Sequence, residues 1–524
     1  MTAAAAGLRT LVVEKTSFWG GTSAFSGGGV WIPANPLMLD DGVEDSFEDA
    51  LAYLQDIVVD EGPATSPERI AAFLRTGPEL VSALSQLGFR WVRAEEYPDY
   101  YPDRPGGRVG RSIEGAVFDG RRLGSLLPSL RRRGDVPPLV VQTRDFAPLT
   151  LTLRTPAGAA RMARVLARTV RWRLERRIPL SAGLSLVGQL MAIAVRDGAG
   201  VWLRSSLREL VVENGAVTGV VIEREGGPVT VHAACGVLLA AGGFARDAAF
   251  RRTYQPTGGE WSSAARGDTG DAIRAGVAVG AATALMDEAW WGPSFLPPGG
   301  GRMFSVWERS LPGAIMVDLG GERYVNESAP YVDVGRAMLD RVASAVPSWL
   351  VLDSRHRRRY PFGAFPPAWT PQALVEEGFF LRASSLAGLA AQMAVDPVAL
   401  KQTVSRFNGF AAAGVDADFG RGGTVYDRYY GDPRVRPNPN LGPIDRPPFW
   451  AVRVYPGDLG TKGGLLTDEH GQVLRTGGAP IPGLYAAGNT TAAVMGRTYP
   501  GPGGTIGPAM VFAHLAARRM ADGA

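Results

Sequence analysis

The sequence contains one cysteine and four histidines among its 524 residues. Cys235 has no partner for a disulfide bond within the chain, and the apolar run CGVLLA that begins at this residue predicts a buried structural thiol. The histidines show no metal-ligand spacing; they are His232, His356, His470 and His514. We therefore expect neither a metal site nor a Cys–His nucleophile pair.

Net charge and long apolar runs are also scarce. The formal net charge of +4 is small for this length, so a nucleic-acid partner is not expected. No run of 18 or more apolar residues occurs, and the sequence does not begin with a charged and then apolar leader, so the expected location is the cytoplasm. With 68 glycines and 39 prolines, the composition favours a loop-rich α/β enzyme of two or more domains over a helical bundle.

Residues Leu11–Val13, followed by Glu14, predict a short buried strand that ends in an acid. In a dinucleotide-binding unit such an acid binds the ribose, about 20 residues after a G-x-G-x-x-G turn. Residues 2–7 would then be the tail of the crossover helix, which ends at Gly7. On this interpretation a first strand and its glycine turn should precede Leu11, and the chain lacks them. The alternative is a flexible N-terminus before an ordinary buried strand.

Other segments suit a flat, phosphate-bearing ligand. Residues 16–29 are rich in glycine and small hydroxyl residues, although an ordinary loop would look similar. Residues 207–224 predict a hairpin with its turn at Glu213-Asn214-Gly215, and residues 236–244 predict a buried strand that runs into a Gly-Gly turn. Residues 483–489 predict another buried strand, and residues 504–510 open a helix whose N–H groups could meet negative charge.

Two regions have a distinct composition. Residues 290–455 carry many aromatic residues and few long apolar strands, which predicts a second domain. Arg161, Arg164, Arg168 and Arg171 fall on one face of a predicted helix. Such a basic stripe can contact an anionic membrane surface, although a solvated surface helix is the more common case.

Taken together, the segments resemble the flavoprotein 3-ketosteroid Δ1-dehydrogenases, within the wider group of fumarate reductase and succinate dehydrogenase flavoproteins. The resemblance spans nearly the whole chain and lies in VVEKTSFWGGTSAFSGGGVWIP, EYPDYY, TGDAIRAGVAVGAATALMDEAWWGP, GERYVNESAPY, GDLGTKGG, LYAAGN and RTYPGPGGTIGPAM. The chain departs from the family at its start, where the family has a first strand and a glycine-rich turn. A misassigned start codon or a truncation is the preferred explanation, and loss of function is the other.

The resemblance implies an α/β fold in which a discontinuous Rossmann-like FAD-binding domain, truncated at its N-terminus, holds an inserted α+β catalytic domain. The expected FAD-binding parts are residues 1–289 and 457–524, and the expected substrate domain is residues 290–456. The implied cofactor is FAD. The residues expected to bind it are Glu14, Gly20, Gly21, Thr22, Ser23, Ser26, Gly27, Gly28, Leu207, Gly242, Gly243, Asp271, Gly488, Asn489, Gly504, Thr505 and Ile506.

The implied reaction, a step of steroid catabolism, removes hydrogens from C1 and C2 of a 3-ketosteroid. FAD accepts a hydride from C1, and an acceptor such as a quinone reoxidises the flavin. By the same resemblance, the Tyr499 hydroxyl and the Gly503 N–H bind the C3 carbonyl, and Tyr331 takes the C2 proton. Because the unperturbed pKa of tyrosine is about 10, Tyr100 is expected to favour the ionised Tyr331 by donating a hydrogen bond. The expected pocket walls are Tyr97, Phe304 and Trp307.

Three alternatives compete with this interpretation. A fumarate-type reductase needs cations for two carboxylates. Such relatives carry His before the Thr-x-Gly-Gly turn, where this chain has Gly460 before Thr461, and Arg in the C-terminal motif, where this chain has YPGPG from Tyr499 to Gly503. A 3-ketosteroid Δ4-dehydrogenase is disfavoured by the tyrosine pattern. A flavin-free steroid-binding remnant follows from the missing glycine turn.

Overall fold

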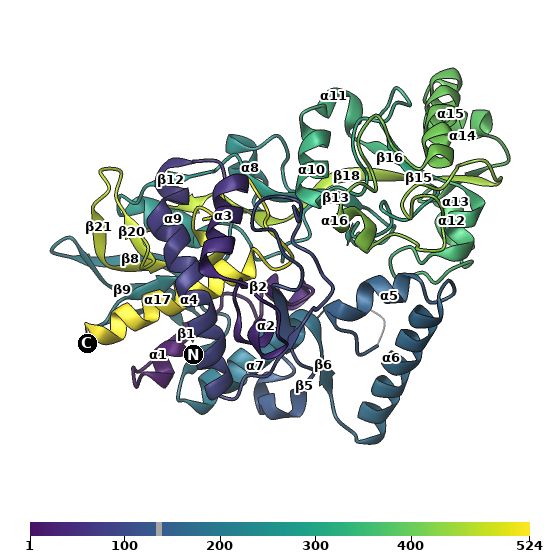
Figure 1. Ribbon diagram of the computed structural model, residues 1–524. Helices are drawn as coiled ribbons and strands as arrows, with labels where there is room; N and C mark the ends of the chain where they lie inside the picture. The colour runs from purple at the N-terminus through teal and green to yellow at the C-terminus, as the bar shows by residue number, and fades with distance from the viewer. Residues whose placement is uncertain (133–138, 524) are drawn as a thin grey trace.

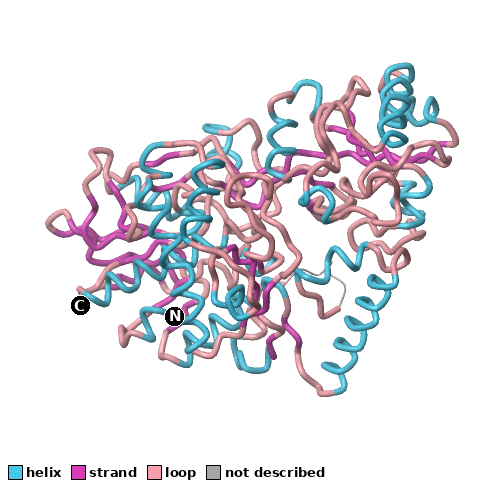
Figure 2. The backbone as a smooth tube through the Cα atoms, in the orientation of Figure 1, coloured by secondary structure: helices cyan, strands magenta, loops and turns pink. Residues whose placement is uncertain are grey.

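The structure is a computed structural model that describes residues 1–132 and 139–523. Helices and strands alternate along the chain and long loops join them (Figure 2). The elements from α10 to α16, green in Figure 1, lie at one end, whereas the first and last segments lie together at the other. There α1 (Thr2–Ala5) meets α17 (Ile506–Asp522), and the Thr2 hydroxyl lies 3.0 Å from His514 Nδ1. The two ends of the chain thus belong to one part of the molecule.

Two small sheets contain the parallel strands. β11 (Val237–Leu239) pairs in parallel with β21 (Pro480–Ala486), which pairs in antiparallel with β20 (Gln472–Leu474). β1 (Leu11–Val13) pairs in parallel with β7 (Gly200–Trp202). Because β11 and β21 run in the same direction, the loops after them emerge at the same edge of the sheet.

The strand predicted before Glu14 is present as β1, but its expected burial is wrong. Val12 and Val13 each expose 37% of their surface. β1 pairs with β7 on one side, and within residues 1–132 and 139–523 no other strand pairs with it. Cys235 is likewise half-buried instead of buried. In both cases the apolar sequence predicted burial, but burial depends on neighbouring segments that the local sequence does not show.

The predicted hairpin is confirmed. β8 (Ser206–Glu213) and β9 (Ala216–Arg224) are joined by Asn214 and Gly215, whose φ angles are +50° and +80°. Two positive φ angles in a two-residue loop suit the right-handed twist of a hairpin. β10 (Gly227–His232) adds a third strand.

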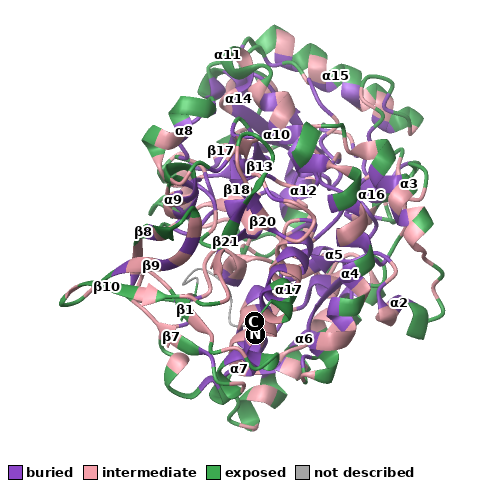
Figure 3. Ribbon diagram, turned by 90° about the vertical axis from the view of Figure 1, so that its left-hand side faces the viewer, coloured by how far each residue is buried: buried purple, intermediate pink, exposed green. Residues whose placement is uncertain are grey.

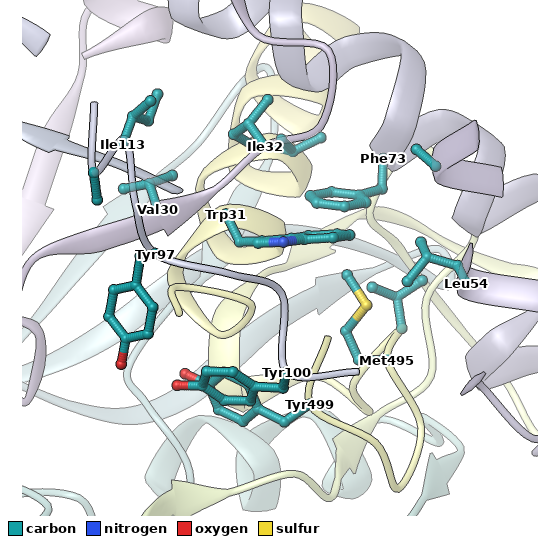
Figure 4. Packing of buried hydrophobic residues seen from close by; sticks show 14 of the residues in the cluster. Val30, Trp31, Ile32, Leu54, Phe73, Tyr97, Tyr100, Ile113, Met495 and Tyr499 are labelled. Atoms are coloured by element: carbon teal, nitrogen blue, oxygen red, sulfur yellow. The ribbon is translucent and has the colours of Figure 1, made fainter. Parts of the chain in front are cut away.

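A core cluster joins the N-terminal half to the C-terminal motif. It includes Trp31 of β2 (Gly29–Trp31), which stacks on Phe73 of α4 (Pro67–Gln86) with ring centroids 6.0 Å apart (Figure 4). β2 also pairs with β4 (Ser112–Gly115), and β4 pairs with β3 (Trp91–Arg93). The cluster extends through α7 (Ala182–Arg196) to α17, so it packs together segments that are distant in sequence.

A six-stranded sheet forms the green part of Figure 1. Its long strand β18 (Phe449–Thr461) pairs with β13 (Ala289–Phe295) on one side and with β16 (Ser348–Leu352) on the other. The other strands are β14 (Met303–Phe304), β15 (Ala314–Val317) and β17 (Leu381–Ala383), and the helices against the sheet are α10 (Tyr331–Leu339), α14 (Leu386–Met393) and α15 (Pro397–Ala413). Figure 3 shows that most of the sheet is buried and that the outer faces of α14 and α15 are exposed.

The predicted basic stripe lies on α6 (Pro156–Leu174), but its arginines do not form one exposed face. Arg161 and Arg168 both form ion pairs with the buried Asp145, and Arg171 pairs with Glu175. The acceptor Asp145 lies outside the helix, in the η4 turn Thr143–Asp145. Helical spacing therefore predicted the helix that carries these arginines, but not the acids that pair with them.

The remaining elements are mostly short. They are α2 (Pro36–Asp40), α3 (Phe47–Ile57), α5 (Phe146–Thr150), α8 (Ala248–Tyr254), α9 (Asp271–Ala278), α11 (Val342–Ala345), α12 (Ser354–Arg359), α13 (Gln372–Glu376), α16 (Val425–Tyr429), β5 (Phe118–Asp119), β6 (Pro179–Leu180), β12 (Thr283–Ala284) and β19 (Gly464–Leu465). Among the helices of the described residues, none has the length and apolar character needed to cross a membrane.

Candidate active site

Three tyrosines from distant segments meet in the core. Tyr100 follows β3, Tyr331 is the first residue of α10, and Tyr499 precedes α17. The ring centroids lie 5.3 Å apart for Tyr100 and Tyr331, 5.1 Å for Tyr100 and Tyr499, and 5.3 Å for Tyr331 and Tyr499. Figure 4 shows the rings of Tyr100 and Tyr499 stacked with their hydroxyl groups side by side. The three residues predicted to share the chemistry therefore form one cluster.

The Tyr100 segment is fixed by a buried ion-pair network. The Trp31 indole N–H donates to Asp99 Oδ1 (2.7 Å), and Arg111 bridges Asp99 and Asp45. The next backbone N–H, that of Tyr100, donates to the Pro500 carbonyl (3.0 Å). This bond ties the Tyr100 segment directly to the loop that carries Tyr499.

The loop before α17 is shaped by close backbone contacts. The Pro500 carbonyl also accepts from the Tyr53 hydroxyl (2.6 Å). Gly503 has φ +102°, and a Cβ atom there would lie 2.5 Å from the Gly29 carbonyl carbon, so only glycine fits. The Thr505 hydroxyl donates to the Tyr499 oxygen (3.0 Å), and Thr505 thus contacts the tyrosine through its side chain.

Burial controls the ionisation of the cluster. Burial raises the pKa of Tyr331 well above 10, and the charge of neighbouring Tyr499 raises it further, while a hydrogen bond from Tyr100 lowers it. Burial also raises the pKa of Tyr499, whereas hydrogen bonds from Thr505, Tyr331 and the Gly503 N–H lower it. The hydrogen bond from Tyr100 thus lowers the pKa of Tyr331, but burial raises this pKa by more.

Of the predicted pocket walls, Phe304 and Tyr97 adjoin the three tyrosines, and Trp307 lies one ring further out. Phe304 packs edge-on against Tyr331 with centroids 4.9 Å apart. Tyr97 stacks on Tyr429 (4.4 Å), and its oxygen accepts from the Tyr430 hydroxyl (3.2 Å). Trp307 lies 6.4 Å from the Tyr430 ring. Aromatic rings therefore line much of the region around the cluster.

Sequence reasoning missed several neighbours of the cluster. The Tyr426 ring lies 4.9 Å from Tyr100, and the Trp290 ring lies 4.8 Å from Tyr499. The aromatic run YDRYY at residues 426–430 was visible in the sequence, but nothing in it indicated which ring faces Tyr100. Trp290 and Trp291 are adjacent, and their alternation on β13 could have assigned one of them to each face.

Four of the residues expected to bind the cofactor follow the parallel strands. Gly242 and Gly243 come after β11, and Gly488 and Asn489 come after β21. The Thr490 hydroxyl joins the two turns because it donates to the Gly242 carbonyl (2.8 Å). A Cβ atom on Gly243 would lie 1.9 Å from Thr461 Oγ1. The Asn489 side chain accepts from the Trp290 indole (3.2 Å).

The glycine-rich loop lies beside the C-terminal motif. Its expected binding residues are Gly20, Gly21, Thr22, Ser23, Ser26, Gly27 and Gly28. The Thr22 hydroxyl accepts from the Ala265 N–H (3.0 Å), and a Cβ atom on Gly28 would lie 2.4 Å from the Ala182 carbonyl carbon. Gly29, the next residue, touches Gly503, which brings this loop to Gly504, Thr505 and Ile506 at the start of α17.

Three residues stand further from this arrangement. Glu14 Oε1 accepts from the N–H of Thr16 (2.8 Å). Asp271 forms an ion pair of 2.5 Å with Lys15, which follows Glu14, so these acids lie at one end of β1. Leu207 lies on β8, where its side chain packs against an apolar cluster that contains Ile273.

A buried acid that the sequence analysis did not select fits a bound cofactor. Asp268 is 6% exposed, and among the described residues neither of its carboxylate oxygens has a hydrogen-bond partner. A Cβ atom on Gly242 would lie 2.4 Å from Asp268 Oδ1. Burial, and then the charge of Asp458, raises the pKa of Asp268 to about 7. Unpaired buried oxygens beside a glycine turn suit a polar ligand, so these residues fit the predicted flavin.

Comparisons with known proteins show the family to which the chain belongs. A family model described as FAD binding domain matches residues 1–506. A 3-oxosteroid 1-dehydrogenase of Mycobacterium tuberculosis is 44% identical, with 100% of this chain and 95% of that protein aligned. A 4-oxocyclohexanecarboxylate 2-dehydrogenase of Sinomonas cyclohexanicum is 35% identical, over 99% of this chain and 90% of that protein.

A solved structure is also similar. It is the 3-ketosteroid Δ1-dehydrogenase of Sterolibacterium denitrificans in complex with 1,4-androstadiene-3,17-dione. Its TM-score is 0.93 at 38% identity, and the match covers 100% of this chain and 96% of that chain. The predicted α/β fold and the predicted cofactor class are thus confirmed.

Proposed function

Because the chain belongs to the family of FAD-binding-domain flavoproteins and matches 3-oxosteroid 1-dehydrogenases along its length, we propose that it desaturates C1–C2 of 3-ketosteroids. The observation that carries the proposal is the buried triangle of Tyr100, Tyr331 and Tyr499. It supplies a proton acceptor and a hydrogen-bond donor within one aromatic site, which is what enolisation of a ketone beside an apolar ring system needs.

Each tyrosine has a distinct role in this proposal. The Tyr499 hydroxyl and the Gly503 N–H donate to the C3 oxygen, where negative charge develops as C2 loses its proton. The ionised Tyr331 oxygen accepts that proton. Tyr100 donates to Tyr331 and favours its ionised form. FAD, when bound, supplies the acceptor for the hydride from C1.

The domain division at residues 289 and 456 is part of the proposal. The six-stranded sheet and its helices support a substrate domain at residues 290–456, with FAD held by residues 1–289 and 457–524. Both boundaries fall on the pair of strands that link the two parts, since β13 begins at Ala289 and β18 continues to Thr461. Tyr331 would then belong to the substrate domain, whereas Tyr100 and Tyr499 would belong to the FAD-binding part.

The surroundings favour an uncharged substrate over a dicarboxylate. Two basic residues next to Tyr499 already have partners: Lys462 donates to two backbone carbonyls, and Arg497 pairs with Glu61, Asp287 and Glu288. A rigid steroid of about 21 heavy atoms at roughly −0.3 kcal/mol per atom binds at about −6 kcal/mol without any ionic anchor. Aromatic walls supply the required contact area.

Product analysis tests the proposal. The purified chain with FAD and an artificial electron acceptor is incubated with androst-4-ene-3,17-dione, with 5α-androstane-3,17-dione, and with 4-oxocyclohexanecarboxylate. We expect loss of two hydrogens from C1 and C2 of both steroids, found by mass spectrometry and NMR. A new double bond at C4–C5 of the saturated steroid would identify a Δ4-dehydrogenase instead. Turnover of the small acid alone would contradict a steroid substrate.

We also propose that α6 contacts an anionic membrane surface, from which an acceptor such as a quinone could be reached. The support is a row of exposed apolar side chains one helical turn apart: Leu166, Val170 and Leu174 expose 47%, 51% and 78% of their surface. Arginines 164, 176 and 177 are exposed beside them. Flotation with phosphatidylglycerol vesicles should be lost in Val170→Asp and kept in the control Val398→Asp, which changes an exposed valine on α15. Equal binding of both variants would contradict this contact.

A further inference from the structure

Lys462 is a fully buried lysine directly behind the Tyr499 loop. It follows the last residue of β18 and exposes 0% of its surface, whereas the side chain of Lys15 is 27% exposed and Lys401 lies exposed on α15. Burial lowers the pKa of Lys462 well below its usual value, and its N–H groups need acceptors whether or not it is charged. Lys462 Nζ finds two such acceptors, the carbonyls of Gly496 (3.1 Å) and Thr498 (2.7 Å).

These acceptors lie three residues and one residue before Tyr499. Lys462 therefore clamps the backbone on the N-terminal side of this tyrosine, while the Pro500 carbonyl is held on the other side by Tyr53 and the Tyr100 N–H. The lysine backbone is itself fixed, because its N–H donates to the Glu288 carbonyl (2.9 Å). The clamp thus starts from a residue directly after β18 whose backbone is itself hydrogen-bonded.

A second contact reaches the Tyr499 ring. The Lys462 ammonium lies 4.4 Å from the Trp290 ring centroid, and the Trp290 ring packs nearly perpendicular to Tyr499, with centroids 4.8 Å apart and planes at 79°. Trp290 is held in turn by its bond to Asn489. Lysine, tryptophan and tyrosine therefore form one stack, in which Lys462 Nζ lies over the face of the indole.

We propose that Lys462 is a positioning residue that sets the Tyr499 hydroxyl against the C3 oxygen of the substrate. This role rests on the proposed function. A donor to a developing oxyanion must lie within about 0.5 Å of its best position, and a shift of about 1 Å can cost about 100-fold in rate. Removal of Lys462 leaves two buried carbonyls unpaired, and the loop that carries them then moves to regain partners.

A double-mutant cycle with Tyr499 tests this role. Lys462→Met, Tyr499→Phe and the double variant are loaded with FAD and mixed anaerobically with androst-4-ene-3,17-dione. The rate of flavin bleaching is measured per bound flavin. We expect Lys462→Met to slow bleaching about tenfold to 100-fold when Tyr499 is present, and less than about threefold in the Tyr499→Phe background. Lys462→Arg, which keeps a buried donor, should recover part of the rate. Lys401→Met is the matched control and should bleach like the wild type.

The possible outcomes separate the two proposals. If Lys462→Met slows bleaching equally with and without the Tyr499 hydroxyl, or does not slow it, the positioning role is refuted. If Lys462→Met does not yield folded flavoprotein, the cycle is run with Lys462→Arg. This variant must then slow bleaching by about threefold or more when Tyr499 is present, and must not slow it in Tyr499→Phe. A wild-type chain that binds FAD but does not bleach with the steroid contradicts the proposed function itself.

Discussion

Replacing Tyr331 by phenylalanine removes one oxygen atom from the centre of the tyrosine cluster. The ring remains, with its edge-on contacts to Phe304 and Tyr499 at 4.9 and 5.3 Å. Tyr331 is 6% exposed, so no water replaces the lost hydroxyl without a rearrangement of the core. The substitution therefore tests chemistry with little change in packing.

The expected magnitudes differ sharply between rate and stability. Loss of a general base lowers the rate by about 10²–10⁴-fold. Loss of a buried hydroxyl with its hydrogen bonds costs about 1 kcal/mol of unfolding free energy, which shifts the Tm by no more than about 4 °C in a chain of this size. A large loss of rate with an almost unchanged Tm is thus the predicted signature.

The assay is anaerobic stopped-flow bleaching of the flavin by androst-4-ene-3,17-dione, together with a thermal melt. The matched control is Tyr426→Phe, because Tyr426 is also buried and its ring also touches Tyr100, at 4.9 Å. We expect the control to keep its rate within about fivefold. If Tyr331→Phe bleaches as fast as the wild type, or if Tyr426→Phe loses as much rate, Tyr331 is not the base.

Three further predictions concern the base, its neighbour and the cofactor turn. Burial raises the pKa of Tyr331 well above 10, so the fraction of ionised Tyr331 grows about tenfold per pH unit below that pKa. We therefore expect kcat/KM to rise between pH 7 and pH 9. A kcat/KM that is constant from pH 7 upward would contradict this. Tyr100→Phe removes a hydrogen bond to Tyr331 and should lower kcat by about tenfold; a loss as large as that of Tyr331→Phe would make Tyr100 the base. Gly243→Ala places a Cβ atom 1.9 Å from Thr461 Oγ1 and should reduce the flavin bound per chain, measured by visible absorbance, whereas Gly477→Ala, which has no atom within 4 Å, should not.

Local sequence patterns located the elements well where the interaction is local. The Asn214-Gly215 turn is local, because it depends on residues within a few positions of one another. The same patterns could not predict what covers an element. Val12 and Val13 are apolar but 37% exposed, and Arg161 and Arg168 turn to Asp145, an acid outside their helix.

The candidate site was predicted unevenly for a related reason. The tyrosines of the triangle could be selected because family motifs mark them, although they are separated by more than 160 residues at each step. Trp290 and Lys462 lie within family motifs and Asp268 lies next to one, but their roles become visible only when folding brings them to Tyr499 and Gly242. Nor could the sequence show that burial outweighs the Tyr100 hydrogen bond in setting the pKa of Tyr331.

The central claim is that this chain uses bound FAD and its tyrosine cluster to oxidise a 3-ketosteroid. The most direct measurement is a visible absorption spectrum of the purified chain with FAD, before and after anaerobic addition of androst-4-ene-3,17-dione. We predict a protein-bound flavin band that bleaches with the steroid and does not bleach in Tyr331→Phe on the same time scale. A protein that remains colourless after incubation with FAD, or a bound flavin that the steroid does not bleach, would contradict the claim.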